Sequence, residues 1–192
     1  MTPANTTGLG GTVVQYGDPE PAHVLSVYAD LRCPYCKRME HGLGAVMEEL
    51  ADRSRLTVEY HFATFIDGAA GGSGSLQALA ALGAAADEGQ KAFMHYLRAL
   101  YAEQPDESDD AFADRSTLLR IAEEVEALRG EDFRQKVTTG AYVPWAREVA
   151  AAFGTSGVDS TPTVLLDGTP LPVINPMGYT ITPEAFLAEL PA

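Results

Sequence analysis

The chain has 192 residues, of which 46% are hydrophobic and 21% are charged. This length fits one domain of ordinary size, with or without an insertion, and is long enough to bury a full apolar core. The 27 acidic side chains outnumber the 13 basic ones and give a net charge of −14, which disfavours nucleic acid and anionic lipid as partners. The composition excludes collagen-like and coiled-coil proteins, and no apolar run reaches the roughly 20 residues of a membrane helix.

Residues 1–11 are polar and rich in Gly and Thr, and we expect them to form a flexible lead. The first Lys or Arg of the chain is Arg32, so the N-terminus has neither the basic region nor the apolar region of a secretory signal. We therefore predict a cytoplasmic location. If a signal has been removed, the alternative is a secreted or extracytoplasmic protein.

The first third of the chain predicts a β-α-β unit. We expect strands over residues 12–16, 23–28 and 56–65, and a helix over residues 33–51. The helix carries an apolar stripe that consists of Met39, Leu43, Val46, Met47 and Leu50. Residues 24–65 therefore predict two parallel strands joined by a right-handed crossover.

The middle of the chain predicts helices, and the end returns to strands. After a Gly/Ala/Ser loop at 67–75 we expect helices over 76–86, 90–102, 116–128, 132–138 and 143–153, with an acidic loop at 106–110. Strands follow at 163–166 and 171–174 around an Asp167-Gly168 turn. Thr182-Pro183 opens a last helix, which we expect to bury Phe186, Leu187 and Leu190. Because neither terminal piece has enough strands for a stable sheet, we predict one sheet domain interrupted by a helical insertion.

The two cysteines of the chain, Cys33 and Cys36, lie three positions apart. A disulfide between them closes almost no loop and stabilises little, so redox chemistry or metal binding explains the pair better. At the start of a helix, Cys33 faces free backbone N–H groups, and the neighbouring Arg32, Lys37 and Arg38 add positive charge. We therefore expect a lowered pKa for Cys33, which attacks a disulfide, and a less exposed Cys36 that resolves the mixed disulfide.

A metal site is the weaker interpretation of this pair, because a structural zinc ion needs two further ligands. The chain has four histidines, His23, His41, His61 and His95, and no two of them have zinc-finger spacing. We predict neither a metal site nor a cofactor.

The residues resemble the DsbA-like branch of the thioredoxin superfamily in three features. The segment Asp30-Leu31-Arg32-Cys33-Pro34-Tyr35-Cys36 follows a hydrophobic strand, and Gly157-Val158-Asp159-Ser160-Thr161-Pro162-Thr163-Val164 is similar to the cis-proline loop of that family. The helical block between the two segments is similar to the DsbA insertion. The resemblance implies an α/β thioredoxin-like fold, with a central mixed sheet flanked by helices, formed by residues 12–70 and 157–192, and an inserted helical subdomain at 71–156.

The resemblance also implies an activity, namely thiol–disulfide exchange between the Cys33–Cys36 pair and protein substrates. It implies a cis Thr161–Pro162 bond beside the cysteines, with the Thr161 backbone pairing with an extended substrate and with Pro34 and Tyr35 contributing to substrate binding. The implied partners are protein thiols and disulfides, and a low-molecular-weight thiol is a further candidate. We expect a monomer without nucleic-acid partners.

Two departures from the family suggest a weaker oxidant than DsbA. Val27 occupies the position of a buried acid, and Tyr35 occupies the position of a histidine between the cysteines. Glu59 and His61 on the next strand are candidates to replace the acid, although solvated positions suit them better.

Two alternative functions stay open. One is a glutaredoxin-like reductase linked to glutathione or mycothiol, and the other is a non-catalytic binding module with a thioredoxin fold. A Cys36→Ser variant separates the dithiol from the monothiol mechanism, and loss of all reductase and oxidase activity with Cys33 intact would favour the binding module.

Overall fold

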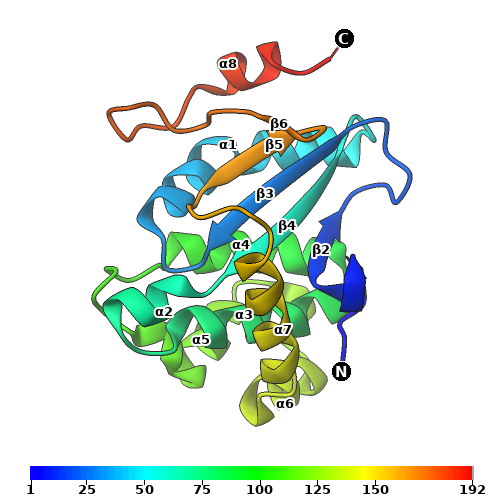
Figure 1. The fold of residues 1–192 in the computed structure, drawn as a ribbon. Coiled ribbons are helices and arrows are strands. Elements are labelled where there is room, and N and C mark those ends of the chain that lie inside the picture. Colours follow the sequence, from blue (N-terminus) through cyan, green and yellow to red (C-terminus); the bar gives the residue numbers. More distant parts are fainter. Residues whose placement is uncertain (192) are drawn as a thin grey trace.

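The computed structural model describes residues 1–191 and contains one mixed sheet with helices on both faces (Figure 1). The strands are β1 (Thr6–Thr7), β2 (Val13–Tyr16), β3 (Val24–Asp30), β4 (Thr57–Ala63), β5 (Thr163–Leu166) and β6 (Thr169–Pro170). They lie in the order β1-β2-β4-β3-β5-β6, in which only β3 and β4 are parallel to each other.

The helices are more numerous and most of them lie between β4 and β5 in the chain. The α-helices are α1 (Pro34–Asp52), α2 (Phe65–Ala70), α3 (Gly74–Glu88), α4 (Gln90–Ala102), α5 (Arg115–Ala122), α6 (Glu131–Thr139), α7 (Val143–Gly154) and α8 (Pro183–Ala188). Short 3-10 helices are η1 (Leu9–Gly11), η2 (Ala111–Ala113) and η3 (Glu126–Leu128). None of these helices is long and apolar enough to cross a membrane, as far as residues 1–191 are concerned.

The predicted β-α-β unit is present as β3, α1 and β4. Along β3 and β4 the side chains alternate between the two faces of the sheet. Val27 pairs with Tyr60, whose ring meets Phe93 of α4, whereas Tyr28 stacks on His61 and meets Phe153 of α7. Figure 1 accordingly shows α7 on the near side of the sheet and α1 and α4 on the far side. The fully buried face is the one that α1 and α4 cover.

Helix α3 lies at the centre of the helical segment and is buried around almost its whole circumference. Its many Ala and Gly residues allow neighbouring helices to approach closely. Gly83 shows this most clearly, because a Cβ atom there would lie 2.6 Å from the Trp145 ring of α7. A single apolar core therefore continues from the sheet into the helical segment.

Four local predictions are wrong. The loop predicted at 67–75 begins with a short helix, α2, and the helix predicted over 116–128 ends at Ala122, because Val125 adopts an extended backbone and turns into the core. The strand predicted at 171–174 is absent and its place is taken by the two-residue strand β6 at Thr169–Pro170, because Pro172 cannot donate to a ladder. In α8 the Thr182 side chain caps the helix as predicted and Phe186 is buried, but Leu187 is 44% exposed.

The domain boundaries and the flexible lead stay predictions. Thr6 and Thr7 of the lead pair with β2, and the Trp145 side chain donates a hydrogen bond to the Gly11 carbonyl oxygen at 2.8 Å. The segments 12–70 and 157–191 contain β2 to β6, and 71–156 contains α3 to α7. Residue 192, the last of the predicted sheet domain, lies outside the described residues.

Candidate active site

The two cysteines lie where β3 ends and α1 begins. Cys33 is the N-cap residue of α1, with an extended backbone, and Pro34 is the first helical residue, where a missing N–H costs nothing. The Cys33 amide donates to the Asp30 carbonyl oxygen at 3.0 Å and fixes the turn between strand and helix. Both thiols are free; Cys36 is wholly buried and 5% of Cys33 is exposed.

The surroundings of the two sulfurs make them unequal. A hydrogen bond from the Cys36 thiol is the largest influence that lowers the pKa of Cys33, and the backbone amides of Cys36 and Tyr35 lower it further. These influences outweigh partial burial and bring the pKa of Cys33 down to about 6. Burial, reinforced by the neighbouring Cys33 sulfur, raises the pKa of Cys36 well above its ordinary value. Cys33 is therefore a thiolate at neutral pH, and Cys36 is a thiol.

The three flanking cations do not provide the field that the sequence predicts. Arg32 is buried and pairs with Asp67 at 2.9 Å and Asp110 at 3.1 Å. Lys37 donates to the carbonyl oxygen of Gln104, just after α4, at 3.2 Å, and Arg38 lies over the Tyr35 ring. Because carboxylates neutralise Arg32, the low pKa of Cys33 comes mainly from hydrogen bonds to its sulfur.

The loop before β5 faces Cys33. The Thr161–Pro162 peptide bond is cis, as the resemblance implies, and the Cys33 Sγ atom lies 3.4 Å from the Thr161 carbonyl oxygen. The structure therefore brings together all six predicted site residues, from positions 33–36 and 161–162.

An open groove of about 390 Å³ continues from this loop. Its lining consists of Tyr35, Ser160, Thr161, Pro162, Ile174, Asn175, Pro176, Met177 and Gly178. The 174–178 segment was not predicted as part of the site, because nothing in the sequence indicates that it folds back toward Tyr35. Met177 in this segment is 77% exposed, and Tyr35 is 44% exposed, so both offer apolar surface beside the cysteines.

Neither acid substitute proposed for Val27 lies on its face of the sheet. Val27 is fully buried opposite Tyr60, whereas Glu59 and His61 project from the other face and are partly exposed. Burial lowers the pKa of His61 to about 4, so its ring is neutral at pH 7. Glu59 and His61 therefore do not replace the acid, in line with the preference for more exposed positions stated above.

A different buried acid, Glu40, was missed. It lies on α1 one turn after Cys36 and is 3% exposed. The signal in the sequence was an acid beside Met39 and Leu43, within the apolar stripe of a helix. No group of three or more His, Cys, Asp or Glu side chains among residues 1–191 could hold a metal ion.

Comparisons with known proteins agree with this geometry. The model of a thioredoxin family matches residues 9–180 of the chain. The reduced form of the disulfide bond oxidoreductase DsbG from Mycobacterium tuberculosis is 28% identical, with a TM-score of 0.76 over 93% of this chain and 86% of that one. Reduced DsbA from the same organism is 27% identical, with a TM-score of 0.75 over 93% of this chain and 90% of that one.

More distant matches concern the fold alone. MdbA, a thiol-disulfide oxidoreductase from Corynebacterium matruchotii, is 21% identical, with a TM-score of 0.72 over 90% of this chain and 88% of that one. No curated protein matches the chain.

Proposed function

The chain belongs to the thioredoxin family and has the predicted α/β thioredoxin-like fold, and we propose that it is a DsbA-like enzyme that exchanges disulfides with protein substrates. The observation that carries the proposal is the inequality of the two thiols. Cys33 has a pKa of about 6 and a small exposed surface, whereas the buried Cys36 stays protonated and donates a hydrogen bond to it.

In the proposed reaction the Cys33 thiolate attacks one sulfur of a substrate disulfide, and the other substrate sulfur leaves as a thiolate. Cys36 then loses its proton and attacks Cys33, which forms the Cys33–Cys36 disulfide and releases the second substrate thiol. Two electrons pass from the cysteine pair to the substrate. The reverse sequence oxidises a substrate dithiol.

We assign substrate positioning to Pro34, Tyr35, Thr161 and Pro162. The support is their place around Cys33 and along the open groove, into which an extended peptide fits. A peptide that adds alongside the backbone of Thr161 brings its cysteine toward the Cys33 sulfur. The exposed faces of Tyr35 and Met177 suit apolar side chains next to that cysteine.

A pair of variants tests the proposal. Cys36→Ser retains the attacking thiol but cannot resolve, so it should accumulate mixed disulfides with an oxidised model protein, whose disulfide the Cys33 thiolate attacks. Cys33→Ser should form none, and the wild type should turn over insulin or a scrambled substrate. Equal activity of wild type and Cys36→Ser with a glutathione mixed disulfide would instead support a monothiol reductase. No activity in any of these assays with Cys33 intact would refute an enzymatic function.

The pKa of Cys33 also supports an intermediate reduction potential. A more acidic attacking thiol stabilises the reduced form and makes the disulfide more oxidising. A pKa of about 6 for Cys33 lies between about 7 for thioredoxin and about 3.5 for DsbA. We therefore expect a potential between about −270 and −120 mV in equilibrium with glutathione. A value at or above −120 mV would contradict the weaker oxidant predicted from Val27 and Tyr35.

The cytoplasmic location, the monomeric state, the absence of nucleic-acid partners and the use of a low-molecular-weight thiol stay predictions. Location decides the direction of the reaction, because a reducing compartment keeps the cysteine pair as thiols and an oxidising compartment keeps it as a disulfide. Alkylation of the protein in intact cells measures the redox state of the Cys33–Cys36 pair, and light scattering measures its oligomeric state.

A further inference from the structure

The outer wall of the groove beside the cysteines is a hairpin in the segment between β6 and α8. This wall hairpin consists of residues 174–180, whose two ends, Ile174 and Thr180, pair in an antiparallel bridge. The Asn175 side chain accepts hydrogen bonds from the amides of Met177 and Tyr179, both at 3.0 Å. The Asn175 amide in turn donates to the Tyr179 carbonyl oxygen at 2.8 Å. These bonds make the wall hairpin one rigid piece, whose position depends on its contacts with the rest of the protein.

The tip of the wall hairpin has few such contacts. Met177 is 77% exposed and Tyr179 is 64% exposed. Within residues 1–191, one hydrogen bond joins residues 175–179 to another part of the chain: the Arg38 guanidinium of α1 donates to the Gly178 carbonyl oxygen at 2.7 Å. The donor is charged, and charge-assisted hydrogen bonds are stronger than bonds between neutral groups. Arg38 is therefore the main polar attachment of the tip.

The same guanidinium also fixes Tyr35, which lines the groove together with the wall hairpin. The Arg38 Cζ atom lies 5.0 Å from the centre of the Tyr35 ring, within the reach of a cation–π contact. A Cβ atom at Gly178 would lie 3.1 Å from the Tyr35 ring and 3.2 Å from Arg38 Nη1, and the backbone there has a φ of +81°. Glycine suits both the close approach and this backbone conformation. Arg38 thus joins the Tyr35 ring and the tip of the wall hairpin into one unit.

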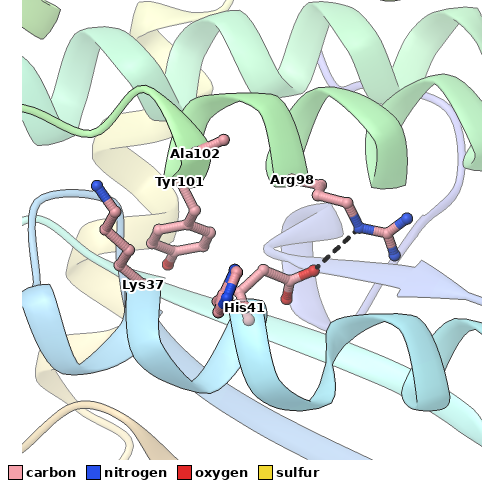
Figure 2. Close-up of a pocket in the computed structure, with 6 residues that line it drawn as sticks. Lys37, His41, Arg98, Tyr101 and Ala102 are labelled. Atoms are coloured by element: carbon pink, nitrogen blue, oxygen red, sulfur yellow. Dashed lines mark ion pairs between the residues drawn. The ribbon is translucent and has the colours of Figure 1, made fainter.

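Helix α1 contacts the wall hairpin at its base as well as at its tip. A Cβ atom at Gly42 would lie 3.0 Å from Thr180 Cγ2, so the base packs closely on the helix. Figure 1 accordingly shows the segment between β6 and α8 beside α1. Lys37, the cation next to Arg38, lines the small pocket of about 70 Å³ between α1 and α4 instead (Figure 2). Arg38 is therefore the cation of α1 that serves the groove.

On the basis of the exchange reaction proposed above, we propose that Arg38 is a positioning residue that holds the wall hairpin against Tyr35 and so sets the shape of the groove for an extended apolar peptide. Arg38 does not line the groove itself, so it acts through Tyr35 and Gly178. The occupant is the substrate segment that carries the reactive cysteine. An apolar side chain beside that cysteine fits between Tyr35 and Met177, whose exposed surfaces are both apolar. Without Arg38 the tip of the wall hairpin is free to move away, and this side chain loses contact surface.

The acidity of the attacking sulfur does not depend on Arg38. The largest influences that lower the pKa of Cys33 are the hydrogen bond from Cys36 and the backbone amides at the start of α1. Loss of Arg38 should therefore weaken the binding of an apolar substrate and leave the rate of attack on the bound substrate unchanged. A purely structural role would not affect binding and attack so differently.

Single-turnover kinetics with two peptides test this role. Each is an uncharged pentapeptide whose central cysteine is blocked as a mixed disulfide with pyridine-2-thiol. Two leucines flank the cysteine in one peptide, and two glycines flank it in the other. The Cys33 thiolate attacks the peptide sulfur, a new disulfide forms between the two, and the pyridine sulfur leaves as a thiolate that is released as pyridine-2-thione. The half-saturating peptide concentration measures binding, and the rate at saturation measures the attack.

The wild type should bind the leucine peptide at least about fivefold more tightly than the glycine peptide, because the groove removes part of the leucine surface from water. In Arg38→Met this preference should fall below about twofold, while the rate at saturation stays within about twofold for both peptides. Arg38→Lys keeps a charged donor for Gly178 and should retain most of the preference. Arg55→Met is the matched control. Arg55 also donates to a carbonyl oxygen of the C-terminal segment, that of Pro191 at 3.3 Å, but outside the lining of the groove, and its loss should leave the preference unchanged.

The outcomes separate this role from the proposed function. Equal binding of the two peptides by the wild type, or an unchanged preference in Arg38→Met, would overturn the role of Arg38. Failure of Arg38→Lys to restore the preference, or an equal loss of preference in Arg55→Met, would overturn it too. Absence of pyridine-2-thione release by the wild type with both peptides would instead refute the attack by Cys33, and with it the proposed function.

Discussion

The hydrogen bond from Cys36 to Cys33 should account for much of the acidity of Cys33, and Cys36→Ala removes it. A hydrogen bond to a charged group is worth about 1.5–3 kcal/mol, and one pKa unit corresponds to about 1.4 kcal/mol. The loss therefore predicts a rise of about one to two units, from about 6 to about 7–8. At pH 7 the thiolate fraction of Cys33 should fall from about nine tenths to between about a half and a tenth.

The rate of alkylation of Cys33 by iodoacetamide, measured from pH 4 to pH 9 by mass spectrometry, gives this pKa directly. Only the thiolate reacts, so the midpoint of the rate profile is the pKa of Cys33. Cys36→Ser is the matched control, because its hydroxyl can still donate to the thiolate and should hold the midpoint closer to 6. A midpoint near 6 in Cys36→Ala, or equal shifts in the two variants, would refute the assignment of the low pKa to this hydrogen bond.

Three further changes test other parts of the structure. Arg32→Met should destabilise the protein by about 3 kcal/mol in urea unfolding, because it removes the buried cation that pairs with Asp67 and Asp110, while the alkylation midpoint of Cys33 stays within about half a unit. Gly83→Ala should destabilise by about 1–3 kcal/mol, since its Cβ atom would overlap the Trp145 ring, whereas an alanine at a glycine without neighbours should not. The wild type should lose stability as the pH falls from about 6.5 to about 4, because the unfolded chain binds the His61 proton more tightly than the native ring does. His61→Phe should remove this loss of stability.

Each of these three has an outcome that contradicts it. A rise of more than one unit in the Cys33 midpoint of Arg32→Met would restore a role for the cationic field. Gly154→Ala, where a Cβ atom meets nothing within 4 Å, is the control for Gly83→Ala, and equal effects would contradict the close helix packing. A parallel pH dependence of wild type and His61→Phe would show that other groups cause the acid loss.

Local sequence signals predicted the parts of the site that depend on neighbours in the chain. Pro34 at the first helical position and the cysteines at the strand–helix junction lie as predicted, because a buried strand followed by such a proline leaves few alternatives. Capping of α8 by Thr182 is equally local and is also confirmed. The position of Thr161-Pro162 beside Cys33 came from the family resemblance, since 128 residues separate them and no local rule connects them.

The sequence did not predict the burial and the ion-pair partners of the charged residues near the site, because both depend on tertiary structure. The sequence suggests that the positive charge of Arg32 lowers the pKa of Cys33, but in the fold this charge is paired with Asp67 and Asp110. Glu40 stands beside Met39 in the apolar stripe of α1, but only the packing of α4 on that stripe shows that its carboxyl group has no hydrogen-bond partner within residues 1–191. In both cases the pairing of a charge depends on helices that are distant in the sequence, and a periodicity argument does not contain that information.

The helical segment between β4 and β5 therefore does more than cover the sheet. Asp30, at the end of β3, accepts a hydrogen bond from Ser75 of α3 at 2.6 Å, and Arg32 pairs with Asp110, just before η2, at 3.1 Å. The Gln104 amide, just after α4, donates to the carbonyl oxygens of the residues on either side of Arg32, at 2.8 and 3.1 Å. The turn that carries the reactive sulfur is thus held by polar groups of the helical segment. These groups satisfy the buried backbone carbonyls and the buried carboxylate of the turn, which would otherwise lack hydrogen-bond partners. A chain without residues 71–156 should consequently lose the geometry of the cysteine motif along with the helices, so we infer that the predicted helical subdomain is part of the scaffold of the site.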